Sequence, residues 1–106
     1  MAIIGFMKES DINQGVEEWK ATPGAILLDV RSRDEYSEGH IPGSRNIPLN
    51  ELAAAADGMA KKDTPVFVYC LSGGRSKRAV AFLKKIGYAN VQNIGGISSY
   101  KGKMEV

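Results

Sequence analysis

The sequence predicts an α/β domain with a small, mostly parallel sheet. Two nearly continuous apolar runs, residues 25–30 and 66–69, are typical of strands that are covered on both faces of such a sheet. Segments with helical patterns alternate with these runs, as in folds that lead from strand to helix to strand. A chain of 106 residues is long enough for one domain with a modest core, so we expect a single unit over residues 1–106.

The first half of the chain contains two predicted strands and two predicted helices. Residues 3–7 form a short apolar run that suits an edge strand. Ser10-Asp-Ile-Asn carries residues that favour a helix N-cap, and we expect a helix from there to about residue 20. The strand at residues 25–30 follows. The alanine-rich stretch from residue 49 to about 59 predicts the second helix.

The strongest helical pattern lies in the second half, over residues 75–86. Its apolar residues fall at i, i+3, i+4 and i+7 and make one stripe, formed by Ala79, Phe82, Leu83 and Ile86. Gly87 follows the stripe and favours a helix end. The strand at residues 66–69 precedes this helix, and a weaker apolar run at residues 90–94 predicts the last strand.

Composition and charge exclude several functional classes. Hydrophobic residues make up 43% of the chain and charged residues 25%, as in ordinary globular proteins. No window approaches the roughly 20 apolar residues of a membrane span, and the N-terminus lacks the features of a signal peptide. A net charge of +2 does not indicate nucleic acid. We therefore expect a cytoplasmic protein without a membrane or nucleic-acid partner.

The charge is unevenly distributed along the chain. Residues 1–69 contain 7 Lys/Arg and 11 Asp/Glu, whereas residues 70–106 contain 7 Lys/Arg and 1 Asp/Glu. Such an asymmetry can attract an anion or an acidic partner. A solvated, lysine-rich surface is the alternative interpretation.

Cys70 is the only cysteine of the chain. An internal disulfide is therefore excluded, and one cysteine with one histidine does not make a zinc site, so no metal is expected. A lone cysteine is most often a small buried residue. Cys70, however, directly follows the strand at residues 66–69, and ligands of α/β sheets bind beyond the carboxyl ends of strands. Its position favours an active-site role.

The loop Cys70-Leu-Ser-Gly-Gly-Arg75 joins this strand to the following helix. A helix N-terminus presents unpaired N–H groups with partial positive charge, and paired glycines let them converge on one point. Such a loop would hold an anion and stabilise a thiolate at its mouth, so the pKa of Cys70 is expected below its usual value of about 8.5. The candidate site consists of Cys70 as nucleophile with Leu71, Ser72, Gly73, Gly74, Arg75 and Ser76 around the anion.

Four polar residues surround the end of this loop, and three of them have two interpretations. Arg75 closes the loop and is expected to face the pocket, whereas Lys77 and Arg78 either add charge at the entry or are solvated. Ser76 suits a hydroxyl donor to a bound anion and equally a first-turn helix residue.

Three further polar residues lie in or after the strand at residues 25–30. Asp29 and Arg31 are expected to form an ion pair that fixes loops, with substrate steering as the alternative. His40 lies in a Gly-His-Ile-Pro-Gly turn and is expected to be structural, because an acidic thiol needs no general base.

Four motifs together resemble the rhodanese family of sulfurtransferases. They are Leu28-Asp-Val-Arg31, Glu35-Tyr-Ser-Glu-Gly-His-Ile-Pro-Gly-Ser-Arg-Asn-Ile-Pro48, Cys70-Leu-Ser-Gly-Gly-Arg-Ser76 and Asn93-Ile-Gly-Gly-Ile-Ser-Ser-Tyr100. Ser44 stands where alanine is usual and Tyr100 where tryptophan is common, and we expect these differences to alter packing rather than chemistry. The resemblance spans residues 11–102 and implies a three-layer, rhodanese-like α/β domain.

The resemblance also implies an activity. The Cys70 thiolate would take the outer sulfur of thiosulfate or a polysulfide and pass it, as a persulfide, to cyanide or a cellular thiol. This chemistry requires no metal or organic cofactor. The alternative is a persulfide carrier or binding module that delivers sulfur to an acceptor protein, with the basic half as its docking face. The sequence does not specify the oligomeric state.

Loop length disfavours a third possibility, a small phosphatase. Related phosphatases and arsenate reductases use Cys-x5-Arg, whereas four residues separate Cys70 from Arg75 here. Tyr69 also stands where those enzymes have a histidine. The shorter loop suits a sulfur atom better than a tetrahedral oxyanion.

Overall fold

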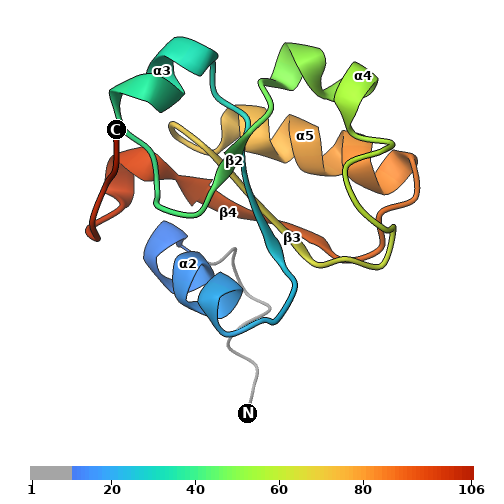
Figure 1. Ribbon diagram of the computed structural model, residues 1–106, viewed down its shortest axis with the longest axis horizontal. Helices are drawn as coiled ribbons and strands as arrows, with labels where there is room; N and C mark the ends of the chain where they lie inside the picture. The colour runs from blue at the N-terminus through green and yellow to red at the C-terminus, as the bar shows by residue number, and fades with distance from the viewer. Residues whose placement is uncertain (1–10) are drawn as a thin grey trace.

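The computed structural model describes residues 11–106 and places four parallel strands in one sheet between helices (Figure 1). The strands are β1 (Ile26–Asp29), β2 (Arg45–Asn46), β3 (Val66–Cys70) and β4 (Val91–Gly96), in the order β2-β1-β3-β4. This arrangement confirms the predicted α/β class and parallel sheet. The predicted edge strand at residues 3–7 lies outside the described residues.

Helices cover both faces of the sheet. Helix α2 (Ile12–Lys20) packs on one face, and α4 (Leu52–Ala55) and α5 (Gly74–Lys85) lie over the other (Figure 1). Every residue of β1 and β3 is buried between these layers. Their double burial explains why both strands appear in the sequence as continuous apolar runs.

Helix α5 follows its predicted course within one residue at each end. Gly73 is its N-cap and has a φ of 106°, a left-handed conformation that favours glycine. Ala79 and Leu83 of the predicted stripe are fully buried, whereas Phe82 lies at the edge of the core. The helix therefore begins at the active-site loop and packs along β3.

The helix predicted over residues 49–59 is shorter than expected. A 3-10 helix (Leu49–Glu51) leads into α4, which ends at Ala55. The buried Tyr88 hydroxyl donates to the Ala56 carbonyl and lies 3.2 Å from that of Ala60. Because this tertiary contact captures a helix-end carbonyl, the chain turns away where alanine propensity alone would continue the helix.

One α-helix and one strand of the structure were absent from the prediction. Helix α3 (Arg33–Glu38) has a capping box in which Ser32 and Glu35 exchange side-chain hydrogen bonds with each other's backbone N–H groups. The Ser-x-x-Glu spacing is a sequence signal for this helix. Strand β2 has two residues, too few for any periodic pattern, and is tied to β1 by the Asn46 side chain, which donates to the Asp29 carbonyl at 3.0 Å.

Within residues 11–106, the structure has no helix of the length and hydrophobicity that a membrane crossing requires.

Candidate active site

Cys70 is the last residue of β3, and its sulfur lies under the loop that leads to α5. The Sγ atom accepts hydrogen bonds from the N–H groups of Gly73 at 3.0 Å and Ser76 at 3.3 Å, and the Ser76 hydroxyl lies 3.4 Å away. Cys70 is only 1% exposed. The sulfur therefore lies beneath the loop, whereas the sequence predicted it at the mouth of the loop. Its side chain points toward α5, and the loop folds back over it to direct its N–H groups inward.

The surroundings of Cys70 favour the thiolate. Burial raises the pKa of the thiol and is the largest single influence, but hydrogen bonds from Ser76, Gly73 and Ser72 together outweigh it, so the pKa lies below the usual value. The N-terminus of the 12-residue helix α5 contributes further positive potential. The geometry therefore supports a nucleophilic sulfur.

Asn93 of β4 supports the loop from below. Its Oδ1 accepts from the Ser76 hydroxyl at 2.7 Å and from the Gly95 N–H at 2.9 Å, and its Nδ2 donates to the Gly73 carbonyl at 3.2 Å. Asn93 begins the fourth motif, but the sequence alone indicated no role for its side chain. This side chain fixes the two residues that donate to Cys70.

The end of β4 also passes directly beneath the loop. A Cβ atom on Gly96 would lie 2.2 Å from the Leu71 carbonyl oxygen and 2.5 Å from Ser72 Cα. The Ser98 N–H, in the 3-10 helix Ile97–Ser99, donates to the same Leu71 carbonyl at 3.1 Å. The close approach therefore requires glycine at position 96, and the fourth motif serves as the floor of the active-site loop.

Arg75 lines a pocket beside α5 and forms an ion pair there. Its two terminal nitrogens donate to the two carboxylate oxygens of Glu35 at 2.7 and 2.9 Å. Hydrogen bonding from Arg75, with help from Ser32, lowers the pKa of Glu35 to about 2, although partial burial opposes the shift. The pair joins the N-terminal turn of α5 to that of α3 and neutralises the charge of Arg75.

Asp29 and Arg31 form the expected structural ion pair. Both are nearly inaccessible, and Arg31 Nη2 donates to Asp29 Oδ2 at 2.7 Å and to the Gly39 carbonyl at 2.8 Å. The expected structural interpretation also fits His40, whose Nδ1 lies 2.9 Å from the Tyr36 carbonyl and whose ring stacks on that of Tyr36. These contacts fix the turn that follows α3.

The hydroxyl of Ser44 has more than a packing role. The Tyr69 hydroxyl lies 3.2 Å from Ser44 Oγ and accepts from the Ile41 N–H at 3.2 Å. Burial raises the pKa of Tyr69 well above its usual value, so this hydroxyl stays protonated. Tyr69 thus anchors the loop around residues 41–44 on the face of the sheet opposite to Cys70.

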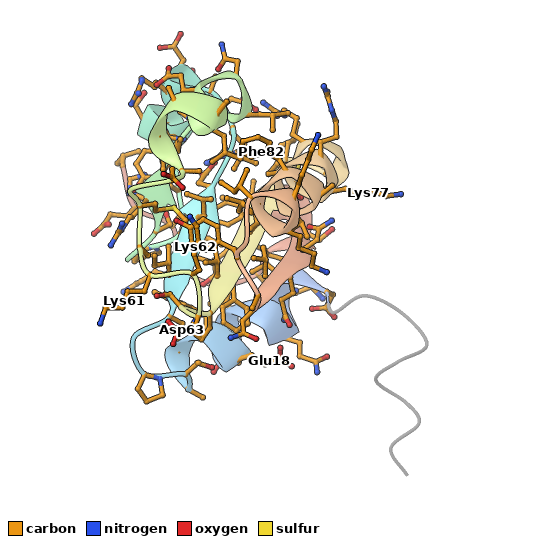
Figure 2. All side chains as sticks on the ribbon, turned by 90° about the vertical axis from the view of Figure 1, so that its right-hand side faces the viewer. Glu18, Lys61, Lys62, Asp63, Lys77 and Phe82 are labelled. Atoms are coloured by element: carbon orange, nitrogen blue, oxygen red, sulfur yellow. The ribbon has the colours of Figure 1, made fainter. Side chains whose placement is uncertain are left out.

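The remaining predicted residues lie at the rim of the site. Leu71, Ser72 and Gly74 are exposed. Lys77 points outward from α5 (Figure 2). Arg78 is exposed and lines a groove next to the loop.

Comparison with known proteins assigns the family. Residues 8–103 match the family described as rhodanese-like domain. The chain belongs to the rhodanese-like family. It is 38% identical to the thiosulfate sulfurtransferase PspE of Escherichia coli over 71 residues, which cover 66% of this chain and 68% of PspE. A solved structure described as rhodanese with anions from E. coli superposes with a TM-score of 0.67 at 32% identity, over 76% of this chain and 96% of that one.

Rhodanese-like domains also occur within longer relatives of this chain. The putative sulfur carrier protein YrkF of Bacillus subtilis is 39% identical over 80 residues, which cover 74% of this chain and 43% of YrkF. Of YrkF and two other curated relatives at 39–40% identity, the chain spans only 25–64% of the length. The match therefore assigns the domain and its family, and the activity of any longer relative is a separate question.

Proposed function

We propose that this rhodanese-like chain is a sulfurtransferase that moves a sulfane sulfur from thiosulfate or a polysulfide to a thiophilic acceptor through a persulfide on Cys70. The observation that carries the proposal is the convergence of the Gly73 and Ser76 N–H groups on Cys70 Sγ, at 3.0 and 3.3 Å. These groups stabilise a thiolate, which is the nucleophilic form of cysteine. The likeness to a relative named thiosulfate sulfurtransferase supports the choice of donor.

In the donor step, the Cys70 thiolate attacks the outer sulfur of thiosulfate. A bond forms between Sγ and this sulfur, the sulfur–sulfur bond of the donor breaks, and its electron pair leaves on sulfite. Backbone N–H groups at positions 71–75 hold the resulting persulfide anion at the N-terminus of α5, with Arg75 as the nearest charged side chain. No proton has to be removed from an ionised thiol, so His40 has no part in the step.

In the acceptor step, cyanide or a thiolate attacks the outer sulfur of the persulfide. The bond between this sulfur and Sγ breaks, and its electron pair restores the Cys70 thiolate. The two half-reactions share one covalent intermediate and should give ping-pong kinetics without a metal or organic cofactor. Because Cys70 is 1% exposed, we expect donor and acceptor to displace side chains at the rim of the loop before they reach the sulfur.

The test is the intact mass of the protein after incubation with thiosulfate or polysulfide. We expect a gain of one sulfur atom that cyanide removes with formation of thiocyanate. Cys70→Ser should show no gain, since serine cannot form a persulfide. A wild-type protein that gains no sulfur from either donor would overturn the proposal.

A persulfide carrier is the second candidate. Two observations favour it: the relative YrkF is named a putative sulfur carrier, and four exposed cations of α5 have no ion-pair partner within residues 11–106, namely Lys77, Arg78, Lys84 and Lys85. A carrier would transfer its persulfide to an acceptor protein much faster than to cyanide, and comparing the two rates separates the roles. Either role suits the cytoplasm, where thiols stay reduced, and cell fractionation checks this location.

A further inference from the structure

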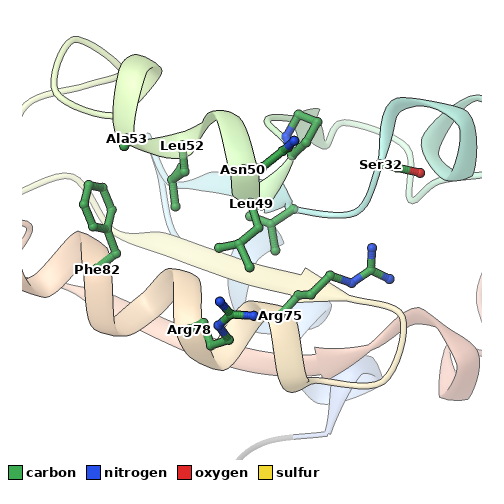
Figure 3. Close-up of a pocket in the computed structure, with 10 residues that line it drawn as sticks. Ser32, Leu49, Asn50, Leu52, Ala53, Arg75, Arg78 and Phe82 are labelled. Carbon is green, nitrogen blue, oxygen red and sulfur yellow. The ribbon is translucent and has the colours of Figure 1, made fainter.

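A groove of about 630 Å³ runs along α5 beside the active-site loop (Figure 3). One wall is a stripe of α5 that contains Arg75, Arg78 and Phe82, at positions i, i+3 and i+7. The 3-10 helix and α4 form the opposite wall, from which Leu49 points toward α5 (Figure 3). Small-molecule sites typically have volumes of roughly 300–1,000 Å³ and mostly apolar walls. The groove has the size and character of such a site.

One end of the groove lies at Val30, next to Cys70, although Cys70 itself does not line the groove. Val30 lines the groove and follows Asp29, which pairs with Tyr69 in the sheet. Val30 therefore lies alongside Cys70 at the carboxyl ends of β1 and β3, and both residues belong to the same core cluster. Arg75, which also lines the groove, closes the loop that begins at Cys70. A molecule in the groove would thus have one end near Cys70 and would reach the sulfur once side chains at the rim of the loop are displaced.

The groove has one positive charge that lacks an ion-pair partner within residues 11–106. Its two charged lining residues are both arginines. Arg75 lines one end of the groove, but its charge is neutralised by Glu35. Arg78 is exposed and forms no ion pair within residues 11–106. It lies on the α5 wall of the groove, below Leu49 in the view of Figure 3. A carboxylate is the complementary group for this guanidinium.

We propose that the groove binds an organic thiol acceptor with a carboxylate close to its sulfur and an apolar chain beyond it. This inference rests on the sulfurtransferase function proposed above. The thiol would lie at the Arg75 end, the carboxylate on Arg78, and the chain between Phe82 and Leu52. A rise of about 1.5 Å per residue places Arg78 about 4.5 Å and Phe82 about 10.5 Å from Arg75 along α5. An N-acylcysteine has its groups in this order.

The acceptor step forms and breaks the same bonds as the acceptor step of the proposed function. The thiolate of the acceptor attacks the outer sulfur of the Cys70 persulfide and becomes an organic persulfide. The bond from Sγ to that sulfur breaks, and Cys70 recovers the thiolate. No oxidant or reductant is consumed.

The kinetic test compares acceptors with the same reactive group. N-hexanoylcysteine and N-acetylcysteine have the same thiol environment but differ by four methylenes, each worth about fourfold when fully buried. Because the groove is open, we expect kcat/KM to be about tenfold higher for the hexanoyl compound, with thiosulfate as donor. Phe82→Ala should remove most of this preference.

Arg78→Gln tests the carboxylate contact, and Lys77→Gln is its matched control. Both side chains are exposed cations on α5, so neither change threatens the fold, but Lys77 points away from the groove. We expect Arg78→Gln to lower kcat/KM about tenfold more for N-hexanoylcysteine than for N-hexanoylcysteamine, which lacks the carboxylate. The proposal would be overturned if Arg78→Gln lowered kcat/KM equally for the two acceptors. It would also be overturned if Lys77→Gln lowered kcat/KM for N-hexanoylcysteine as selectively as Arg78→Gln.

A binding measurement separates this inference from the proposed function. N-hexanoylalanine has no sulfur, so calorimetry reports its binding whether or not the protein transfers sulfur. We expect binding to the wild type that weakens about tenfold in Arg78→Gln. Failure of the protein to form a persulfide would contradict the proposed function alone. The groove proposal would be overturned if the persulfide formed normally but N-hexanoylalanine did not bind and the acceptors showed no chain-length preference. This is the result expected if a protein segment occupies the groove instead.

Discussion

At the scale of single residues, a balance between burial and hydrogen bonding sets the pKa of the Cys70 thiol. A thiol this inaccessible would ordinarily stay protonated, because burial disfavours the charged form. Ser76 opposes that tendency with its N–H and its hydroxyl, both within 3.4 Å of the sulfur. The Ser76 hydroxyl has a single proton, which Asn93 Oδ1 also accepts at 2.7 Å, so Asn93 fixes the position of this hydroxyl but competes with the sulfur for its proton.

Ser76→Ala should therefore make the thiol less acidic. The substitution keeps the N–H of residue 76 but removes the hydroxyl donor. A full hydrogen bond to a charged group contributes about 1.5 kcal/mol, but Asn93 competes for this proton, so we expect the ratio of thiolate to thiol at neutral pH to fall by up to about tenfold. The rate of alkylation by iodoacetamide as a function of pH measures this change. Its midpoint should move to higher pH.

Ser72→Ala is the matched control for this measurement. Ser72 contributes through its backbone N–H, which alanine retains, and its side chain is exposed. The alkylation profile of this variant should follow the wild type. An equal shift in both variants would mean that the loop geometry, rather than the Ser76 hydroxyl, sets the pKa of Cys70.

At the scale of elements, the active-site loop is held by its neighbours rather than by its own sequence. Strand β4 supports it from below, and α3 is joined to α5 across it by Glu35 and Arg75. The loop brings its N–H groups to Cys70 only while both supports are in place. Changes at the supports should therefore affect activity more than their distance from the sulfur suggests.

Gly96→Ala should disrupt the loop. The new methyl group would meet the Leu71 carbonyl at 2.2 Å, so the loop or the strand has to move. Overpacking of this kind costs about 1–3 kcal/mol, and we expect at least a tenfold loss of sulfur transfer, measured as thiocyanate formation. Gly58→Ala is the control, because its methyl group would have no neighbour within 4 Å. If Gly96→Ala kept wild-type activity, β4 would not be the support of the loop.

Glu35→Gln should weaken the connection between α3 and α5. The pKa of Glu35 is lowered to about 2, so the carboxylate stabilises the fold above its ordinary pKa near 4.5, and this contribution is lost as pH falls from there toward 2. For a partly exposed pair, we expect a loss of about 1 kcal/mol in the free energy of unfolding at pH 7. The difference between wild type and variant should shrink toward pH 2.

Urea unfolding at pH 7 and at pH 3 measures this difference. Glu38→Gln is the control, since Glu38 lies on the same helix and forms no ion pair within residues 11–106. Its unfolding should follow the wild type at both pH values. A Glu35→Gln difference that stayed constant with pH would contradict the ion-pair origin.

At the scale of the whole molecule, two hydrophobic clusters share the central sheet. One lies between the sheet and α5, and the other between the sheet and α2. Strands β1 and β3 contribute alternate side chains to each cluster, so neither cluster can lose its packing without exposing strands that the other needs. The two sides should therefore unfold together.

Leu83→Ala tests this coupling. Leu83 is fully buried on the α5 side, and its truncation should destabilise the chain by about 2–5 kcal/mol. Trp19, the only tryptophan, lies on α2 against the opposite cluster. We expect tryptophan fluorescence and far-UV circular dichroism to give the same, lowered urea midpoint. Lys84→Ala, at an exposed neighbouring position, should change stability by less than about 0.5 kcal/mol. Separate midpoints for the two probes would contradict the coupling.

The sequence by itself determined the parts of this protein that depend on local patterns. Continuous apolar runs identified β1 and β3, a helical stripe identified α5, and the position of Cys70 between β3 and α5 marked the candidate active-site loop. Burial on one or both faces leaves a periodic record in the sequence, and four motifs in order were enough to indicate the family. The capping box of α3 was also readable, although the prediction did not include it.

Only the tertiary structure decided how the site is assembled. Arg75 meets Glu35 across 40 positions of the chain, Asn93 reaches the loop from another strand, and the two residues of β2 follow no periodic pattern. The burial of Cys70 and the groove beside α5 likewise depend on how separate elements pack. Such contacts leave no local pattern, because each partner looks like an ordinary polar or apolar residue until the fold brings the two together.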